Sequence, residues 1–231
     1  MRDTICVITG VGPGTGTALV KKFSERYRVA MIARKEERLD ALAMAIPGAI
    51  PFVCDVSDRE ALASTISKID ALGDTEVVIH NAVGGGGGDV LSLDPDLLEQ
   101  NFRVNTTALL QLVQSFAPAM VEAGRGAILA TGNTAAYRGR VNFASFAPTK
   151  AAQRILLESA ARLLGPKGVH VAYIAIDAAI DVPWTRKMLP DHPDDFFANP
   201  DDIAGECFHI AHQRQSSWTF DVVLRPFGET W

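Results

Sequence analysis

A glycine-rich segment at residues 9–16 is the first part of this sequence that suggests chemistry. It lies between a short apolar run, 4–9, and a stretch with apolar residues at helical spacing, 15–27. Glycine permits a tight turn and lets backbone N–H groups approach an anion, and a helix N-terminus favours negative charge. No Lys-Ser or Lys-Thr pair follows the last glycine, which argues against a Walker A loop. We therefore expect a nucleotide phosphate, rather than only a flexible turn, at Gly10, Gly12, Gly14, Thr15 and Gly16.

The end of the second expected strand indicates which nucleotide binds. Folds that bind dinucleotides carry a ribose-reading residue about 20 positions after the glycines. Here Ala33 is followed by Arg34 and Lys35, and the first acidic residue is Glu36. A guanidinium suits a 2′-phosphate, whereas an acid would bind the 2′-hydroxyl. We therefore expect NADP rather than NAD, with a solvated Arg34 as the alternative.

The same glycine loop also resembles the loop that holds S-adenosylmethionine in methyltransferases. Those enzymes commonly place a carboxylate at the end of the second strand, where it binds the ribose hydroxyls. Because Arg34 stands there instead, a methyltransferase is the weaker hypothesis.

The surrounding sequence alternates β-branched runs with longer amphipathic stretches, which predicts strands separated by helices. Such strands pair in parallel through right-handed crossovers, so we expect an α/β fold, a doubly wound three-layer sandwich with a seven-stranded parallel sheet. Nothing resembles a linker, so residues 1–231 should form one domain, with 178–199 as a loop beside the substrate. Strands are expected at 4–9, 29–33, 50–54, 77–79, 127–130, 169–176 and 220–224, and helices at 15–27, 36–45, after Ser57, at 95–122, at 146–164 and from Asn199.

Composition restricts the class of protein further. Of 231 residues 48% are hydrophobic, which allows a packed core, and the net charge of -5 argues against non-specific nucleic-acid binding. No apolar stretch reaches the roughly 18–20 residues that a bilayer span needs. The three cysteines form no metal-binding pair and suggest reduced thiols in the cytoplasm. His209 and His212 have no third ligand nearby in sequence, so we expect no metal site. The expected partner is a small molecule.

Seven short motifs, in their order and spacing, resemble the short-chain dehydrogenase/reductase family over almost the whole chain. They lie at 9–16, 54–56, 80–82, 104–106, 146–152, 163–171 and 180–183. The resemblance implies a Rossmann-like fold, a nicotinamide cofactor, and a homodimer or homotetramer paired through 95–122 and 146–164, with Phe227 and Trp231 against a neighbour. It also implies that the cofactor contacts Asp55, Val56, Asn81, Ala82, Lys150 and Ile180, whereas His80, where the family often has Asn, is expected to be structural.

The catalytic centre departs from the family pattern. The family uses an Asn, a Ser, a Tyr and a Lys, and Asn105 and Lys150 stand at two of these positions. Phe146 replaces the Tyr, and a phenyl ring has no proton to transfer. Asn133 replaces the Ser, and its amide is expected to orient a substrate. The candidates for another proton donor are Thr134, Tyr137, Ser145 and Asp177, the last of which is also a candidate turn cap.

Three functions are therefore compatible with the sequence. The first is an NAD(P)(H)-dependent oxidoreductase with a non-standard proton donor, acting on a small, partly apolar molecule. The second is an NADP-binding sensor or partner protein with little or no turnover. The third is the methyltransferase.

Overall fold

A seven-stranded parallel sheet forms the centre of the computed structural model, which describes residues 4–228. The strand order is β3-β2-β1-β4-β5-β6-β9, and every neighbouring pair is parallel. The chain crosses from one half of the sheet to the other between β3 and β4, as in a doubly wound, Rossmann-like fold. The expected fold class is confirmed. The strands are β1 (Ile5–Thr9), β2 (Arg28–Ala33), β3 (Ala49–Val53), β4 (Thr75–His80), β5 (Gly126–Gly132), β6 (Val169–Ile176) and β9 (Asp221–Leu224).

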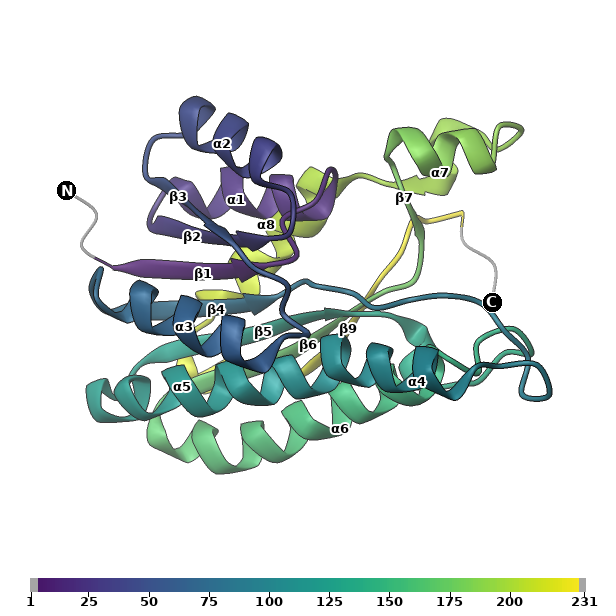
Figure 1. Ribbon diagram of the computed structural model, residues 1–231. Coiled ribbons are helices and arrows are strands. Elements are labelled where there is room, and N and C mark those ends of the chain that lie inside the picture. The colour runs from purple at the N-terminus through teal and green to yellow at the C-terminus, as the bar shows by residue number, and fades with distance from the viewer. Residues whose placement is uncertain (1–3, 229–231) are drawn as a thin grey trace.

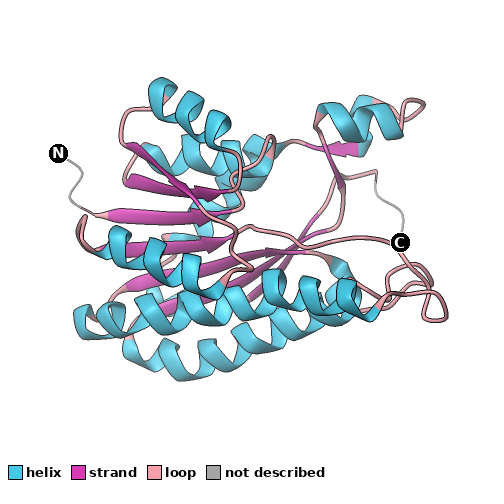
Figure 2. Cartoon of the chain, in the orientation of Figure 1, coloured by secondary structure: helices cyan, strands magenta, loops and turns pink. Residues whose placement is uncertain are grey.

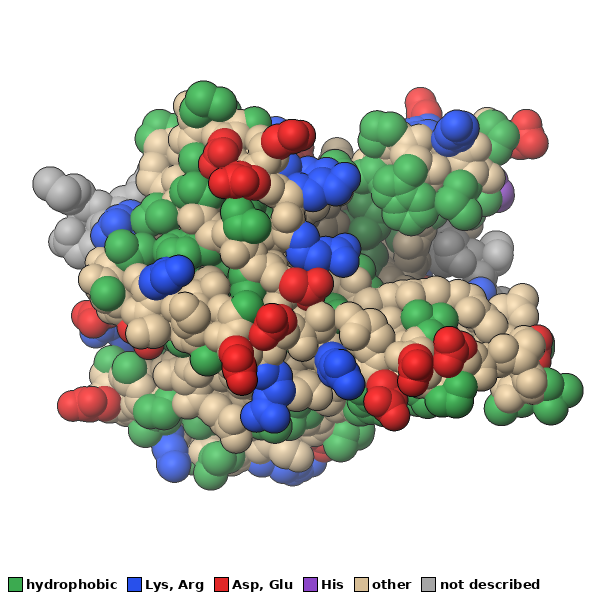
Figure 3. Space-filling view, viewed as in Figure 1, with side chains coloured by type: hydrophobic (Ala, Val, Ile, Leu, Met, Phe, Trp, Pro, Cys, Tyr) green, Lys and Arg blue, Asp and Glu red, His purple; other side chains and the backbone are tan. Residues whose placement is uncertain are grey.

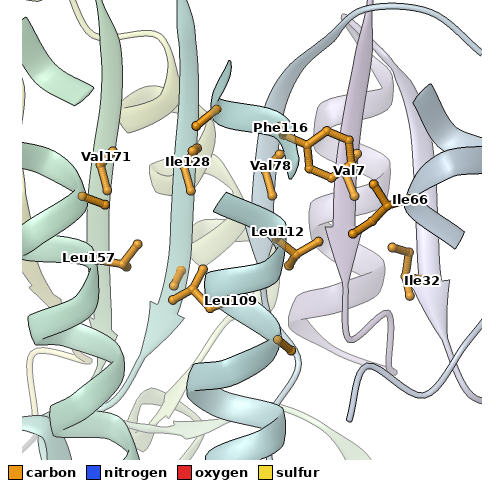
Figure 4. Packing of buried hydrophobic residues seen from close by; sticks show 14 of the residues in the cluster. Val7, Ile32, Ile66, Val78, Leu109, Leu112, Phe116, Ile128, Leu157 and Val171 are labelled. Carbon is orange, nitrogen blue, oxygen red and sulfur yellow. The ribbon is translucent and has the colours of Figure 1, made fainter. Parts of the chain in front are cut away.

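Helices cover both faces of the sheet (Figures 1 and 2). One face packs against α1 (Thr15–Ser24), α2 (Glu36–Ala45) and α8 (Pro200–Ala211). The other face packs against α3 (Arg59–Asp70), α5 (Ala108–Ala123) and α6 (Ala147–Leu164). Figure 4 shows α5 lying over the central strands, with Phe116 beside Val7. Two apolar cores, one on each side, hold the strand ends in register.

The helix expected at 95–122 has two parts. It consists of α4 (Pro95–Phe102) and α5, joined by a π-helical turn at Arg103–Thr107. Such turns inside α-helices are frequent at functional sites, and this one carries the buried Asn105. A second difference concerns α3, which is capped by Asp58 and not by Ser57, since the Asp58 carboxylate accepts hydrogen bonds from the backbone N–H groups of Glu60 and Ala61.

The segment 178–199 is folded rather than irregular. It contains β7 (Ala179–Ile180) and β8 (Phe197–Ala198), which pair in parallel, and α7 (Pro183–Met188) between them. The guanidinium of Arg186 donates to Asp181 at 2.7 and 2.8 Å and lies 4.1 Å over the ring of Phe197. These contacts join the two ends of the segment, whose helix α7 is at the upper right of Figure 1.

Two other expectations concern the surface. Within residues 4–228, no helix is both long enough and apolar enough to cross a membrane. Phe227 is 88% exposed, and Trp231 lies outside the described residues. The expected self-association stays a prediction.

Candidate functional site

The glycine loop lies against the end of β4. Gly10 and Gly14 have φ angles of 70° and 90°, a region that favours glycine. A Cβ atom on Gly10 would lie 2.4 Å from the backbone nitrogen of Ala82, and one on Gly16 would lie 2.6 Å from the Gly10 oxygen. The Asn81 amide donates to the Gly10 carbonyl at 2.8 Å and accepts from the Thr131 hydroxyl at 2.8 Å. The ends of β1, β4 and β5 are thereby fixed to one another.

The start of α1 fits a phosphate group. The Thr15 hydroxyl is buried and has no hydrogen-bond partner among the described residues. No side chain caps this helix, and no acidic residue lies in its first turn. A buried hydroxyl without a partner and the helix dipole together favour an anion. These residues, with Gly12 and Gly14 preceding them, fit the pyrophosphate of a dinucleotide.

Arg34 and Asp55 lie together where β2 and β3 end. The Arg34 side chain is 78% exposed, and its Nη1 lies 3.9 Å from Asp55 Oδ2. Asp55 Oδ1 accepts from the backbone N–H and the hydroxyl of Ser57 at 2.9 and 2.8 Å, and Val56 is buried. Basic side chains gather in this region beside α2, at the edge that faces α7 (Figure 3). An exposed guanidinium at this edge is accessible to a phosphate.

Ile180 lies close to the glycine loop. A Cβ atom built on Gly14 would lie 3.8 Å from a methyl group of Ile180 and 2.5 Å from one of Val182. The segment after β6 therefore covers the glycine loop, on the side where the resemblance places the cofactor.

Lys150 is held by a buried amide. Its side chain is buried, and Nζ donates to Gln153 Oε1 at 2.8 Å and to the Thr131 carbonyl at 3.4 Å. Gln153 Nε2 donates in turn to the Asn105 carbonyl at 2.8 Å. Burial lowers the pKa of Lys150 to about 7. Sequence reasoning missed Gln153, although an amide one helical turn after Lys150 was the available signal.

Asn105 links this chain of hydrogen bonds to the run of glycines. Its Oδ1 accepts from the Gly84 N–H, and its Nδ2 donates to the Gly84 carbonyl, both at 2.9 Å. Nδ2 also donates to the Thr149 hydroxyl at 2.8 Å. Asn105 and Lys150 thus lie near each other and are linked by the Gln153 amide, which accepts from Lys150 and donates to the Asn105 carbonyl.

The side chains at the two altered positions have different surroundings. The Phe146 ring centroid lies 5.8 Å from Lys150 Nζ, so the phenyl ring is next to the amine. Asn133 Nδ2 donates to the Ile176 carbonyl at 3.0 Å, and its Oδ1 accepts from the Ala135 N–H at 2.9 Å. The Asn133 amide therefore joins the ends of β5 and β6, an arrangement that competes with the expected orientation of a substrate.

Three polar side chains near the site are occupied by structural partners. Tyr137 donates its proton to the carboxylate of Asp221, and burial together with that carboxylate raises the pKa of Tyr137. Ser145 donates to the Gly86 carbonyl at 2.8 Å. His80 Nε2 donates to the Val104 carbonyl at 3.0 Å, and burial, with the nearby Lys150, lowers the pKa of His80 to about 3. The hydroxyl groups of Tyr137 and Ser145 and the Nε2–H of His80 are thus all bonded within the protein.

Thr134 and Asp177 form a hydroxyl–carboxylate pair beside a cavity. Thr134 Oγ1 donates to Asp177 Oδ1, and Asp177 Oδ2 lies 3.6 Å from Arg138 Nη2. The cavity has a volume of about 210 Å³, and its lining also includes Asn133 and Phe143. Of the proton-donor candidates from the sequence, Thr134 and Asp177 are the two that line it.

Comparison with known proteins gives consistent matches over almost the whole chain. A model of the short chain dehydrogenase family matches residues 4–190. Carbonyl reductase (NADPH) 2 of Sus scrofa is 26% identical over 233 residues, which cover 96% of this chain and 94% of that protein. A short-chain dehydrogenase from Rhodopseudomonas palustris superposes with a TM-score of 0.84 and 27% identity, covering 98% of this chain and 100% of that one. A metagenomic short-chain oxidoreductase in complex with NADP gives a TM-score of 0.84 and 28% identity, covering 98% of each chain.

Proposed function

This chain belongs to the short-chain dehydrogenase family of oxidoreductases, and on that premise we propose that it is an NADP(H)-dependent enzyme in which Asp177 exchanges a proton with the substrate oxygen. The observation that carries the proposal is the Thr134–Asp177 pair at the cavity, together with the absence of a hydroxyl on Phe146. A nicotinamide cofactor, when bound, supplies or accepts the hydride at the substrate carbon.

The residues that would hold the cofactor come from four separate segments of the chain. The first turn of α1, with Thr15, would bind the pyrophosphate, and Arg34, after β2, would bind the 2′-phosphate of the adenosine end. Ile180 in β7 would line the cofactor on the side of α7. Lys150 is fixed by Gln153 and Asn105 beside Phe146, so that it can contact the nicotinamide ribose.

Asp177 then acts on the substrate oxygen. Its carboxylate takes the proton of a substrate hydroxyl while the carbon loses its hydride, and in the reverse direction the carboxyl group returns that proton to the carbonyl oxygen. Thr134 holds the carboxylate by donating to Oδ1, and Arg138 lies against Oδ2. The Asp177 carboxylate can therefore act as the base when the substrate is oxidised, and its protonated form as the acid when the substrate is reduced.

A specific observation favours a second candidate, a cofactor-binding protein without turnover. Both polar atoms of the Asn133 amide are bonded to backbone atoms, and Phe146 has no proton. In that case NADP(H) would bind while no alcohol or carbonyl compound changed the cofactor's redox state. No specific observation favours the methyltransferase, and the family match weighs against it.

Asp177→Asn should lower kcat/KM by about 10²–10⁴-fold, because the amide cannot accept the substrate proton. The dissociation constant of NADP(H) should change less than twofold. NADPH oxidation and NADP⁺ reduction, measured over a panel of neutral and anionic alcohols and ketones, give the first quantity, and isothermal titration gives the second. Asp181→Asn is the matched control, since the Asp181 carboxylate pairs with Arg186 and lies outside the cavity lining. Equal rates for Asp177→Asn and wild type would contradict the role of Asp177, and no turnover by wild type would favour the second candidate.

Arg34→Ala should weaken NADP(H) binding by about 10–100-fold and leave NAD(H) binding unchanged. A hydrogen bond to a charged group is worth about 1.5–3 kcal/mol, and only NADP(H) carries the 2′-phosphate. Isothermal titration of both cofactors measures the effect. Lys35→Ala removes the neighbouring positive charge and should have a smaller effect. If the two variants weaken NADP(H) equally, the selectivity comes from general charge and not from Arg34.

A further inference from the structure

A second cavity adjoins the one that contains Asp177. Its volume is about 360 Å³, and it shares four lining residues with the smaller cavity, namely Ala135, Arg138, Arg140 and Phe143. The start of α6 supplies much of the remaining wall, with small side chains at Ala147, Pro148 and Ala151. A ligand that reaches Asp177 from the larger cavity therefore passes both arginines.

The charge in these cavities is unbalanced. Two guanidinium groups line the larger cavity, and among the described residues that line it none is acidic. In the smaller cavity Asp177 is the acidic residue, and its Oδ2 is paired with Arg138 at 3.6 Å. Arg140 lies 5.9 Å from the ring centroid of Phe143, and no carboxylate among residues 4–228 pairs with it. The net positive charge is thus concentrated at Arg140.

This arrangement is suited to a carboxylate. A guanidinium presents two parallel N–H groups that match the two oxygens of a carboxylate. The Phe143 ring and the alanine walls would contact the carbon chain between the anionic group and the reacting carbon. A neutral ketone or alcohol would offer the exposed guanidinium of Arg140 no opposite charge.

We propose that the substrate is a small organic acid whose carboxylate binds Arg140, with Phe143 against its carbon chain. The placement of the reacting carbon at Asp177 rests on the proposed function, whereas the binding of the carboxylate by Arg140 does not. Arg140 is then a specificity-determining residue, because its guanidinium favours a negatively charged substrate over neutral carbonyl compounds.

The test measures binding without turnover. Protein saturated with NADP⁺ is titrated calorimetrically with 2-oxohexanoate and with its methyl ester, which differ in the negative charge. We expect the acid to bind at least tenfold more tightly than the ester, and Arg140→Ala to remove that difference while leaving the affinity for the ester within twofold. Arg125→Ala is the matched control, since it removes an arginine near the start of β5, at the opposite edge of the sheet.

Equal affinities of wild type for acid and ester, or an unchanged difference in Arg140→Ala, would overturn the proposal. A difference that disappears equally in Arg125→Ala would also overturn it, because the effect would then be general electrostatics. If Arg140 selects the acid and Asp177→Asn leaves turnover unchanged, the carboxylate site stands and the assignment of Asp177 fails.

Discussion

Phe146→Tyr should raise the rate of reduction of simple ketones and aldehydes by at least about 10²-fold. Wild type should reduce such compounds slowly, because the aromatic ring beside Lys150 has no hydroxyl to donate and because they lack the carboxylate that would place the reacting carbon at Asp177. General acid catalysis is typically worth about 10²–10⁴-fold. A tyrosine at this position would place a phenol hydroxyl, which can give its proton to the carbonyl oxygen, next to the Lys150 amine. Steady-state NADPH oxidation over a ketone and aldehyde panel measures the change. Adding Asn133→Ser should raise the rate further, since the shorter side chain provides a hydroxyl that can bind the carbonyl oxygen.

Phe208→Tyr is the matched control for this experiment. Phe208 lies on α8, on the other face of the sheet, with its ring centroid 5.1 Å from that of Phe23, and it lines neither cavity. A new hydroxyl on Phe208 should leave the rate within a few-fold of wild type. If wild type already reduces the panel at about 1–10³ s⁻¹, the missing hydroxyl is not limiting and another group supplies the proton efficiently.

Lys150→Met should raise the unfolding free energy of the cofactor-free protein most at acidic pH. The difference between variant and wild type should be roughly 3–5 kcal/mol more favourable to the variant at pH 6 than at pH 10. Burial lowers the pKa of Lys150 from its usual value near 10.5 to about 7 in the folded protein. Between these values the unfolded chain holds a proton that the folded chain does not, so wild-type stability rises with pH through this window. Each pKa unit is worth about 1.4 kcal/mol, and methionine has no charge to bury.

The readout is the pH dependence of the difference in unfolding free energy between wild type and variant, measured with urea at pH 6, 8 and 10. The loss of the hydrogen bond to Gln153 costs the variant about 1–3 kcal/mol at every pH and does not alter the slope. Lys167→Met is the control for the loss of a lysine outside this site, since Lys167 lies at the opposite edge of the sheet just before β6. A constant difference for Lys150→Met over the whole range would mean that the buried amine keeps its ordinary pKa.

Local sequence was sufficient where the structure depends on neighbouring residues. The segment 9–16 predicted a glycine turn because the φ values at Gly10 and Gly14 need glycine there. The bounds of α2 and β6 agree with the expected ranges, and α8 begins after Asn199, whose side chain accepts from the Asp201 N–H. Caps, periodic apolar positions and glycine turns act within a few residues, so the sequence carries them directly.

The arrangement of the candidate site depends on contacts between distant segments. Nothing in the spacing of residues indicated that Tyr137 would bond to Asp221, 84 positions away, or that the Asn133 amide would bond to Ile176, 43 positions away. The pairing of Gln153 with the Asn105 carbonyl spans 48 positions. From residue type alone, the proton-donor candidates of the sequence could not be ranked. The sheet then brought some of them to backbone or carboxylate partners and left Thr134 and Asp177 at the cavity, because a buried polar group must find a partner wherever packing places it.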